Sequence, residues 1–234
     1  IGLTIEEAAD INAFGKLEVG VNVDDSGSDT FTSRLAYLGV DGGDLGKFSV
    51  GRQDSVFTAV TGATDVFNVY GSNADQNQGS RLSNTLVISN GVGLASVSTL
   101  IQMDGADNTK DIDKYEISAT LSGVSVGYSK DNNTDISYMA ASGSIDLAEI
   151  SVTGAYSVKD NAGTETKGYE VVASIGSINA GYGEIVDGDS FITAGIDHPI
   201  TGALSVYAEY QLEQNDTAGA KDQNNYAIGT KIVF

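Results

Sequence analysis

The chain has 234 residues and a mass of 24.2 kDa, and its 32 acidic residues against 12 basic ones give a formal net charge of −20. This balance excludes a nucleic-acid-binding surface, because phosphate backbones are bound by clustered Lys and Arg. The absence of cysteine excludes disulfides, thiol catalysis and cysteine metal sites, and the single histidine, His198, excludes a histidine cluster. A mean hydropathy of −0.07 is typical of a soluble protein, but the placement of the apolar residues indicates otherwise.

The beginning of the chain carries no targeting pattern. Residues 1–10 are acidic and contain neither the basic nor the apolar part of a signal peptide, so they indicate mature or trimmed sequence. We expect them to form a lead-in to a single β-barrel domain that occupies residues 1–234. No run of about eighteen apolar residues exists, so the sequence predicts no transmembrane helix.

Alternation of apolar and polar residues with period two runs along the whole chain and predicts strands. In the segment 204–213, for example, Leu204, Val206 and Ala208 alternate with Ser205 and Glu209. The pattern predicts about fourteen strands, in chain order near 11–23, 31–40, 47–52, 81–88, 94–103, 113–122, 124–130, 135–145, 148–158, 168–175, 177–186, 190–197, 203–213 and 223–234.

The connections between these strands alternate in length. Tight turns such as 122–123 and 176–177 alternate with long polar links, of which 160–167 and 214–222 are examples. One connection, residues 53–80, is far longer than the others, and loops of that length are usually functional or disordered. The pattern is typical of an antiparallel up-and-down meander, which is either a soluble sandwich or a closed barrel.

The two faces of the strands distinguish these architectures. One face carries Leu, Val, Ile, Ala and Tyr, which suits lipid, and the other carries Ser, Thr, Glu, Gln, Asn and Gly, which suits water. A soluble sandwich would turn its polar face toward a core, whereas a barrel of this size encloses a wet lumen. We therefore predict a transmembrane antiparallel β-barrel of about fourteen strands, or sixteen if the count is low.

Three stretches resemble the Gram-negative general-diffusion porins. They are the hairpin 33–53, which contains Val50-Gly51-Arg52, the long connection 54–80, and the last strand, which ends in Phe234. The resemblance implies an outer-membrane location, a homotrimer and a constriction loop, residues 53–80, that folds into the barrel. Family members typically have sixteen strands, so the chain is one hairpin short, and we place the shortfall between the strands at 11–23 and 31–40.

By the same resemblance, basic side chains on the barrel wall face carboxylates on the loop across the constriction. Such an arrangement creates a transverse field that orients polar solutes. The basic positions are Arg52, Arg81, Arg34 and Lys16, and the acidic ones are Asp65, Asp54 and Asp75. Strict alternation directs Arg52 toward lipid, and a β-bulge at Gly51 is the feature that would turn it inward.

Other residues have structural roles in this interpretation. Phe57, Phe67 and Tyr70 are too apolar for a free loop in water, and we expect them to anchor the loop to the inner wall. Phe234, Ile232 and Tyr226 resemble the terminal signal that the outer-membrane assembly machinery reads. Four glutamates with lumen parity, Glu116, Glu170, Glu209 and Glu213, are interpreted as general wall polarity.

The remaining chemistry is limited. His198 precedes the lone proline in a turn and has no nucleophile suggested near it, so the sequence predicts no enzyme. No cofactor is expected, although the acidic links could bind divalent cations weakly, shared with lipopolysaccharide phosphates.

The leading hypothesis is passive diffusion of small hydrophilic solutes and ions, with a preference for cations that follows from the net charge. The expected partners are outer-membrane lipid, lipopolysaccharide and the solutes. Two alternatives are a structural or adhesive outer-membrane barrel with a closed lumen and a soluble secreted acidic β-sandwich.

Overall fold

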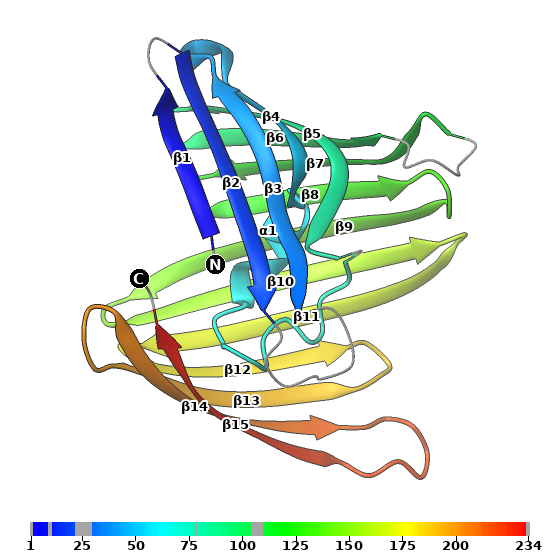
Figure 1. The fold of residues 1–234 in the computed structure, drawn as a ribbon. Coiled ribbons are helices and arrows are strands. Elements are labelled where there is room, and N and C mark those ends of the chain that lie inside the picture. Colours follow the sequence, from blue (N-terminus) through cyan, green and yellow to red (C-terminus); the bar gives the residue numbers. More distant parts are fainter. Residues whose placement is uncertain (1, 9–10, 22–29, 78, 104–109, 233–234) are drawn as a thin grey trace. The chain divides into compact units, whose positions relative to one another are not determined.

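The computed structural model describes residues 2–8, 11–21, 30–77, 79–103 and 110–232. These residues form one antiparallel sheet of 15 strands, in which each strand is hydrogen-bonded to the next one in sequence (Figure 1). The strands are β1 (Gly2–Ala8), β2 (Ile11–Val21), β3 (Phe31–Asp41), β4 (Lys47–Asp54), β5 (Arg81–Val92), β6 (Ala95–Met103), β7 (Ile112–Leu121), β8 (Val124–Asp131), β9 (Ile136–Leu147), β10 (Ile150–Asn161), β11 (Thr164–Ile175), β12 (Ile178–Ile185), β13 (Ser190–Pro199), β14 (Leu204–Gln214) and β15 (Gln223–Ile232).

Helical structure is confined to three short turns, η1 (Gly43–Leu45), α1 (Thr58–Thr61) and η2 (Gly62–Thr64), within the described residues. In that part of the chain, no helix has the length and apolar character needed to cross a membrane. The strand order β1 to β15 without a crossover confirms the predicted up-and-down topology.

The first strand corrects the prediction for residues 1–10. Strands β2 to β15 correspond to the fourteen predicted ones, but the expected lead-in contains β1, which pairs with β2 from Gly2↔Glu18 to Ala8↔Ile11. The alternation in Leu3-Thr4-Ile5-Glu6 is too short to predict a strand, and pairing with β2 supplies the hydrogen-bond partners. The expected shortfall of one hairpin after the strand at 11–23 stays a prediction, and the direct pairing of β2 with β3 is what a missing hairpin would leave.

The predicted long link 160–167 is wrong. Strand β10 extends to Asn161 and β11 begins at Thr164, so only Ala162 and Gly163 remain in the turn, with φ of 52° and 88°. The polar residues that suggested a link, such as Asp160 and Glu165, are paired across the hairpin. Polar side chains do not prevent backbone pairing, and two positive φ values are typical of a tight hairpin turn.

By its internal contacts the chain divides into two compact units. The first unit comprises residues 1–59, 78–122 and 127–137, and the second comprises residues 60–77, 123–126 and 138–234. The long connection between β4 and β5 therefore contributes its first part to the first unit and residues 60–77 to the second.

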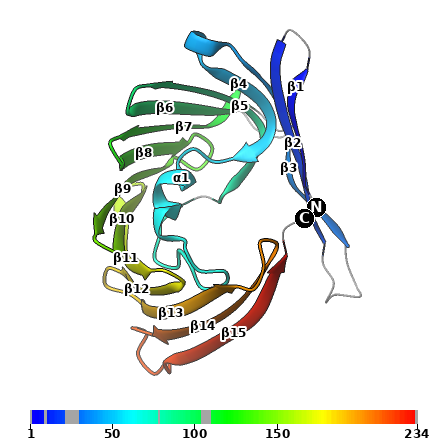
Figure 2. The same cartoon turned by 90° about the vertical axis from the view of Figure 1, so that its left-hand side faces the viewer.

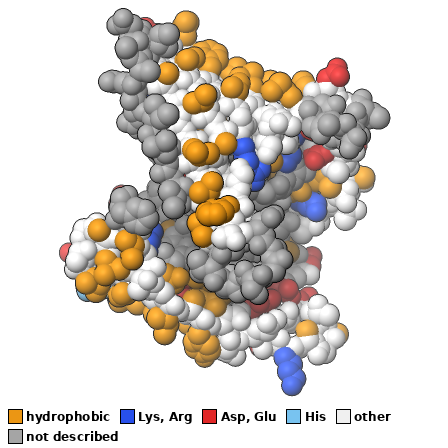
Figure 3. Space-filling model, viewed as in Figure 1, with side chains coloured by type: hydrophobic (Ala, Val, Ile, Leu, Met, Phe, Trp, Pro, Cys, Tyr) orange, Lys and Arg blue, Asp and Glu red, His pale blue; other side chains and the backbone are white. Residues whose placement is uncertain are grey.

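The sheet of each unit exposes apolar side chains on one face and covers polar ones on the other. In the first unit, Val50 is 53% exposed whereas Glu116 is 2% exposed. In the second unit, Ile228 is 87% exposed whereas Glu209 is 5% exposed. On the face that Figure 3 shows, hydrophobic side chains gather in several patches. This pattern is the reverse of a water-soluble sheet and matches a sheet whose apolar face contacts lipid.

Tyrosines gather in pairs near the strand ends. The ring centroids are 6.1 Å apart for Tyr115 and Tyr128, and 5.2 Å apart for Tyr210 and Tyr226. The Tyr210 hydroxyl donates a hydrogen bond to Asn224 Oδ1 at 2.7 Å. An aromatic ring with a polar tip suits the boundary between lipid tails and headgroups.

The bulge expected at Gly51 lies on the partner strand instead. Between the pairs Gly51↔Thr85 and Gln53↔Leu82, the single residue Arg52 of β4 opposes two residues of β5, Ser83 and Asn84, and Asn84 has a φ of 57°. On its other side β4 pairs with β3 without a shift, through Tyr37↔Gly51 and Ala36↔Arg52. Gly51 has a φ of 132°, and a Cβ at this position would overlap the carbonyl oxygen of Ala36, so glycine is required here without forming a bulge.

Candidate functional site

The long connection begins at Ser55, directly after β4, and returns to the sheet at Arg81, where β5 begins. We call residues 55–59 the root segment and residues 60–77 the distal segment. The two segments belong to different compact units and are described separately. Buried glutamates from the strands make the main polar contacts, one with the root segment and two with the distal segment.

Glu116 of β7 holds the root segment. Its carboxylate accepts hydrogen bonds from Ser55 Oγ at 2.7 Å, from the Phe57 N–H at 3.2 Å and from Ser129 Oγ at 3.3 Å. Ser55 Oγ in turn accepts the Thr58 N–H at 3.0 Å, which orients the first turn of α1. Phe57 is 1% exposed, so the first of the three predicted anchoring residues is fully covered.

An apolar cluster supports the same root segment. Val56 packs with Leu82 and Leu100, and Val87 lies against them at partial exposure. These side chains come from the loop and from β5 and β6, so the root segment joins the wall through a small hydrophobic core.

Glu209 of β14 holds the middle of the distal segment. Its carboxylate accepts the consecutive backbone N–H groups of Asn68, Val69 and Tyr70, the latter two at 2.9 and 3.2 Å. The Tyr70 carbonyl oxygen accepts a bond from Gln211 Nε2 at 3.5 Å. Figure 2 shows the distal segment lying against one face of the strands of its own unit.

Glu170 of β11 holds both ends of the distal segment. It accepts the Thr64 hydroxyl at 2.5 Å and the Ala74 N–H at 2.8 Å, and it is 7% exposed. Further along, the Gln76 N–H donates to Ser157 Oγ at 2.7 Å. Charge-assisted hydrogen bonds of this kind are stronger than neutral ones, so buried carboxylates are effective tethers.

Glycines form the floor beneath the distal segment. The Phe67 ring lies over Gly181 and Gly195, where an added Cβ would come within 3.2 and 3.1 Å of it. Ala74 is fully buried over Gly168 and Gly183. Four strand positions without a side chain therefore let the loop approach the sheet backbone closely.

The distal segment carries two acidic residues, as predicted. Desolvation raises the pKa of Asp65, and the charges of Glu170 and Glu209 raise it further. Burial also raises the pKa of Asp75, although a hydrogen bond from Asn77 Nδ2 at 2.8 Å opposes the effect. Within the described residues of the second unit, no salt bridge joins either carboxylate to a basic side chain.

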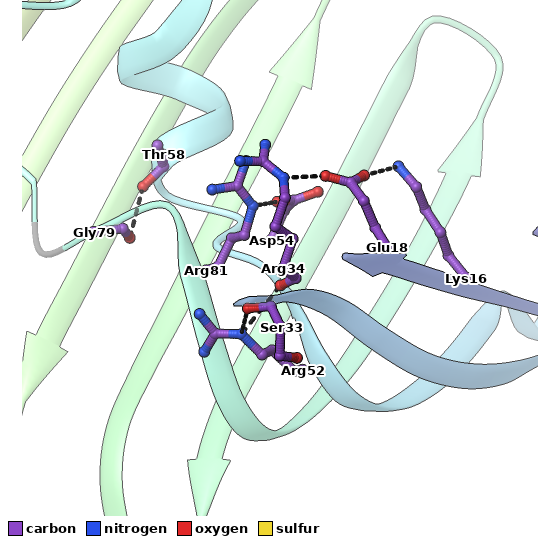
Figure 4. Close-up of polar contacts among 9 residues, drawn as sticks. All are labelled: Lys16, Glu18, Ser33, Arg34, Arg52, Asp54, Thr58, Gly79 and Arg81. Carbon is purple, nitrogen blue, oxygen red and sulfur yellow. Dashed lines mark hydrogen bonds and ion pairs between the residues drawn. The ribbon is translucent and has the colours of Figure 1, made fainter. Parts of the chain in front are cut away.

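Basic residues gather on the wall of the first unit (Figure 4). Glu18 Oε2 lies 3.2 Å from Lys16 Nζ, and Glu18 Oε1 pairs with Arg34 Nε. Arg81 Nε lies 3.8 Å from Asp54 Oδ1. Lys16, Arg34, Arg81 and Asp54 are all predicted site residues, so four of the seven form ion pairs within the first unit, which also contains Arg52.

The Arg52 side chain takes no part in these ion pairs (Figure 4). Its guanidinium donates to the Ser33 and Arg34 carbonyl oxygens at 3.2 and 3.1 Å, and to Ser83 Oγ at 2.8 Å. The bulge lies in β5 opposite Arg52 and not at Gly51, and the Arg52 side chain bonds to the ends of the neighbouring strands. The geometry thus assigns Arg52 a role in fixing the hairpin.

Sequence reasoning missed two kinds of residue. Glu18 was not predicted as a site residue, although it shares the polar face of its strand with Lys16. Glu116, Glu170 and Glu209 were interpreted as wall polarity, whereas each of them binds the loop backbone. Their shared signal is a glutamate at a lumen position, which does not by itself reveal a backbone partner far away in the sequence.

The terminal residues and the acidic links complete the predicted set. Tyr226 and Ile232 lie on the same face of β15 and are 72% and 62% exposed. Phe234 lies outside the described residues. In the described part of the chain, no group of three or more His, Asp or Glu side chains is arranged to hold a metal ion.

Comparisons with known proteins agree with this architecture. The family model described as Gram-negative porin matches residues 1–231. No curated protein matches the sequence. Among solved structures, a loop-deletion mutant of OmpT, an outer membrane protein of Vibrio cholerae, has a TM-score of 0.74 at 18% identity and covers 99% of this chain and 89% of its own.

Two further solved structures share the fold. OmpF of Salmonella typhi, in complex with daunomycin, has a TM-score of 0.74 at 18% identity and covers 98% of this chain and 88% of its own. The outer membrane channel DcaP of Acinetobacter baumannii has a TM-score of 0.68 at 14% identity, with 98% and 82% covered. A soluble sandwich is thereby excluded, and the apolar sheet face is the lipid-facing side of a transmembrane barrel. The chain belongs to the Gram-negative porin family, whose members are outer-membrane β-barrel channels for diffusion.

Proposed function

We propose that the chain forms a water-filled channel for small hydrophilic solutes and ions, with a preference for cations. The observation that carries this proposal is the loop between β4 and β5, which buried glutamates hold along a polar sheet face. A loop fixed in this way narrows a barrel without filling it, and its exposed carboxylate, Asp65, then contacts the permeating solute.

The cation preference is supported by an imbalance of charge between the two groups of site residues. In the first unit, Lys16 and Arg34 share Glu18, and Arg81 lies near Asp54, so basic side chains have acidic partners. In the second unit, Asp65 lies near Glu170 and Glu209, which are also acidic. The surplus of negative charge, together with the net charge of −20, raises the local concentration of cations.

Solute-induced swelling of liposomes that contain the protein tests the channel. We expect swelling with small uncharged sugars and a steep decrease in rate as the sugar becomes larger. An Asp65→Asn variant should leave the sugar rates unchanged, because an uncharged solute does not sense the carboxylate. Absence of swelling with every sugar would instead favour the structural or adhesive barrel with a closed lumen.

We further propose that the protein assembles as a homotrimer. One structural neighbour is described as the trimer form of OmpT from Vibrio cholerae, with a TM-score of 0.72 at 18% identity. The outer face of β2 to β4 suits such a contact, because Leu38 and Val50 border a shallow apolar groove of about 370 Å³. The mass of the detergent-solubilised protein, measured by light scattering with correction for detergent, tests this proposal.

Other interactions of the family remain proposals for this chain. Phe234, Ile232 and Tyr226 would be read by the outer-membrane assembly machinery, and the acidic links would share divalent cations with lipopolysaccharide phosphates. A catalytic role is not proposed, because His198 at the end of β13 has no hydrogen bond to a nucleophile among the described residues. Deletion of Phe234 should lower the amount of assembled protein in the outer membrane.

A further inference from the structure

We propose that Glu209 is a positioning residue whose carboxylate occupies an anion-binding nest formed by three consecutive backbone N–H groups of the distal segment, and that this contact fixes the position of Asp65. The inference rests on the proposed function, because Asp65 is taken to contact the permeating ion. It goes beyond that function by assigning the selectivity of the channel to a wall residue that does not itself have to contact the solute.

The nest is defined by the direction of its donors. Glu209 Oε1 accepts the Asn68 N–H, and Oε2 accepts the N–H groups of Val69 and Tyr70 at 2.9 and 3.2 Å. Successive N–H groups that converge on one anion create a concave site of positive partial charge. Since Glu209 is only 5% exposed, water competes little for these donors, and the buried charge is compensated by the three bonds.

The surroundings of Glu209 hold its side chain in one place. A Cβ added at Gly195 would lie 3.1 Å from Glu209 Cγ and 3.1 Å from Phe67 Cδ1, so the methylene and the ring share the same glycine. Gln211, on the same face of β14, donates to Thr193 Oγ1 at 3.1 Å and to the Tyr70 carbonyl oxygen at 3.5 Å. Glu209 and Gln211 therefore bind both backbone polar groups of Tyr70, its N–H and its carbonyl oxygen.

The position of Asp65 depends on these hydrogen bonds because Asp65 and Gly71 are in contact at the two ends of the turn 65–71. The Asp65 carboxylate lies against Gly71 so closely that a Cβ at position 71 would overlap it. Residues 68–70, which Glu209 holds, lie inside the turn that Asp65 and Gly71 close. Release of the three N–H groups therefore frees the turn that carries Asp65, while Glu170 still holds Thr64 and Ala74.

The absence of cysteine from the sequence allows a direct measurement of loop release. Ser72 lies two residues beyond Tyr70, and its Oγ is buried without a hydrogen-bond partner among the described residues. A Ser72→Cys substitution is nearly isosteric and places the only thiol of the chain in the distal segment, at a buried side-chain position. Its rate of reaction with a water-soluble thiol reagent reports the fraction of time for which the loop is open.

The experiment compares Glu209→Ala with Glu213→Ala in the Ser72→Cys background, using full-length protein in liposomes. Glu213 lies on the same strand and face, and its removal changes the net charge equally. We expect Glu209→Ala to increase the labelling rate by about tenfold or more, because hydrogen bonds to a charged group are lost. Addition of sodium formate, a small carboxylate that fits the vacated nest, should restore slow labelling in Glu209→Ala alone.

Two results would overturn the proposal. The first is equal labelling of Glu209→Ala and Glu213→Ala, and the second is fast labelling of Glu209→Ala that formate does not slow. If Glu209→Ala does not assemble, Glu209→Gln replaces it, and we expect faster labelling because one acceptor oxygen becomes a donor. The labelling experiment does not require that the protein conducts. Failure of the wild type to conduct would therefore contradict the proposed function, whereas the labelling rates would still show whether Glu209 holds the loop.

Discussion

The carbonyl oxygen of Ala74 lies directly over the Cα atom of Gly168, and a Cβ at position 168 would overlap it. Gly168 belongs to β11, two residues before Glu170, which accepts the Ala74 N–H at 2.8 Å. The same short stretch of strand therefore supplies both the space and the tether for this part of the loop. A side chain at position 168 would oppose the contact that Glu170 makes.

Replacement of Gly168 by Ala should displace the distal segment from the wall. The φ of Gly168 is not in the left-handed region, so the strand itself accepts Ala and the effect is steric. We expect a loss of about 1–3 kcal/mol in the free energy of unfolding, as for other overpacked sites, together with a noisier single-channel current. Gly154→Ala on β10 is the matched control, because its nearest neighbour would be an ordinary 3.7 Å contact. Identical currents from both variants would contradict the claim that glycine at position 168 makes room for the distal segment.

The cation preference should fall in mildly acidic solution because of Asp65. Desolvation and the neighbouring Glu170 and Glu209 raise the pKa of Asp65, so it loses its charge at a higher pH than an ordinary Asp, whose pKa is about 4. The reversal potential in a salt gradient should therefore move toward zero as the pH falls through this raised value. Asp65→Asn should remove that change.

An exposed carboxyl provides the control for this titration. The hydrogen bond and charge of Lys130 lower the pKa of Asp135, so Asp135→Asn should leave the pH dependence above pH ~4 unaltered.

The pH dependence of the free energy of unfolding gives a second measurement of the raised pKa of Asp65. A raised pKa in the folded state means that the contribution of Asp65 to stability is present below its unfolded pKa and is lost as the pH rises through its folded one. Asp65→Asn should accordingly be more stable than the wild type at neutral pH.

Removal of an acidic side chain and removal of a basic one from the ion-paired group Lys16, Glu18 and Arg34 should shift the ion selectivity in opposite directions. Glu18→Gln removes the carboxylate shared by Lys16 and Arg34, so it should weaken the cation preference. Arg34→Gln should strengthen it. Reversal potentials in a KCl gradient measure both effects. A shift of the same sign in the two variants would show that the group acts through its structure and not through its charge.

Arg52→Gln should behave differently from Arg34→Gln. The Arg52 guanidinium bonds to the Ser33 carbonyl oxygen and to Ser83 Oγ, and it takes no part in the ion pairs of that group. We expect unchanged selectivity and a loss of about 1 kcal/mol in the free energy of unfolding, from the missing hydrogen bonds. Denaturant unfolding in liposomes, combined with the reversal potential, separates the two roles.

A charged side chain near the middle of a strand, on the lipid-facing side, should destabilise the folded protein. Val171 is 46% exposed on β11, whereas Ser174 lies on the opposite face of the same strand. Val171→Lys should lower the free energy of unfolding from the bilayer by about 2–4 kcal/mol, and Ser174→Lys should have a much smaller effect. Equal costs at the two positions would contradict the assignment of the lipid-facing side.

Local sequence rules predicted the strands well. Period-two alternation located β2 to β15, and because this feature depends on neighbouring residues, the sequence displays it directly. The bulge expected at Gly51 lies instead in β5, at Ser83 and Asn84, because the register depends on the partner strand, which a single strand's sequence does not display. The short β1 was missed because four alternating residues do not define a period, and the link 160–167 was wrong because polarity was interpreted as a loop.

The tethers of the loop could not be predicted in the same way. Glu209 bonds to Val69, 140 positions away in the sequence, and Glu116 bonds to Phe57 across 59 positions. Their donors are backbone N–H groups, which carry no residue signature. The anchoring assigned to Phe57 and Phe67 rested on apolar character, which is visible in a sequence, but the glycines beneath Phe67 became recognisable only once the strands were paired.

Single-channel recording of the wild-type protein in a planar bilayer with a KCl gradient tests the central claim most directly. We expect stepwise, ohmic currents and a reversal potential with the sign of a cation-preferring channel. Comparison with an Asp65→Ala/Arg81→Ala variant should change the conductance or the reversal potential, because the resemblance to porins assigns both residues to the constriction. Protein that inserts into the bilayer and passes no current would contradict the account.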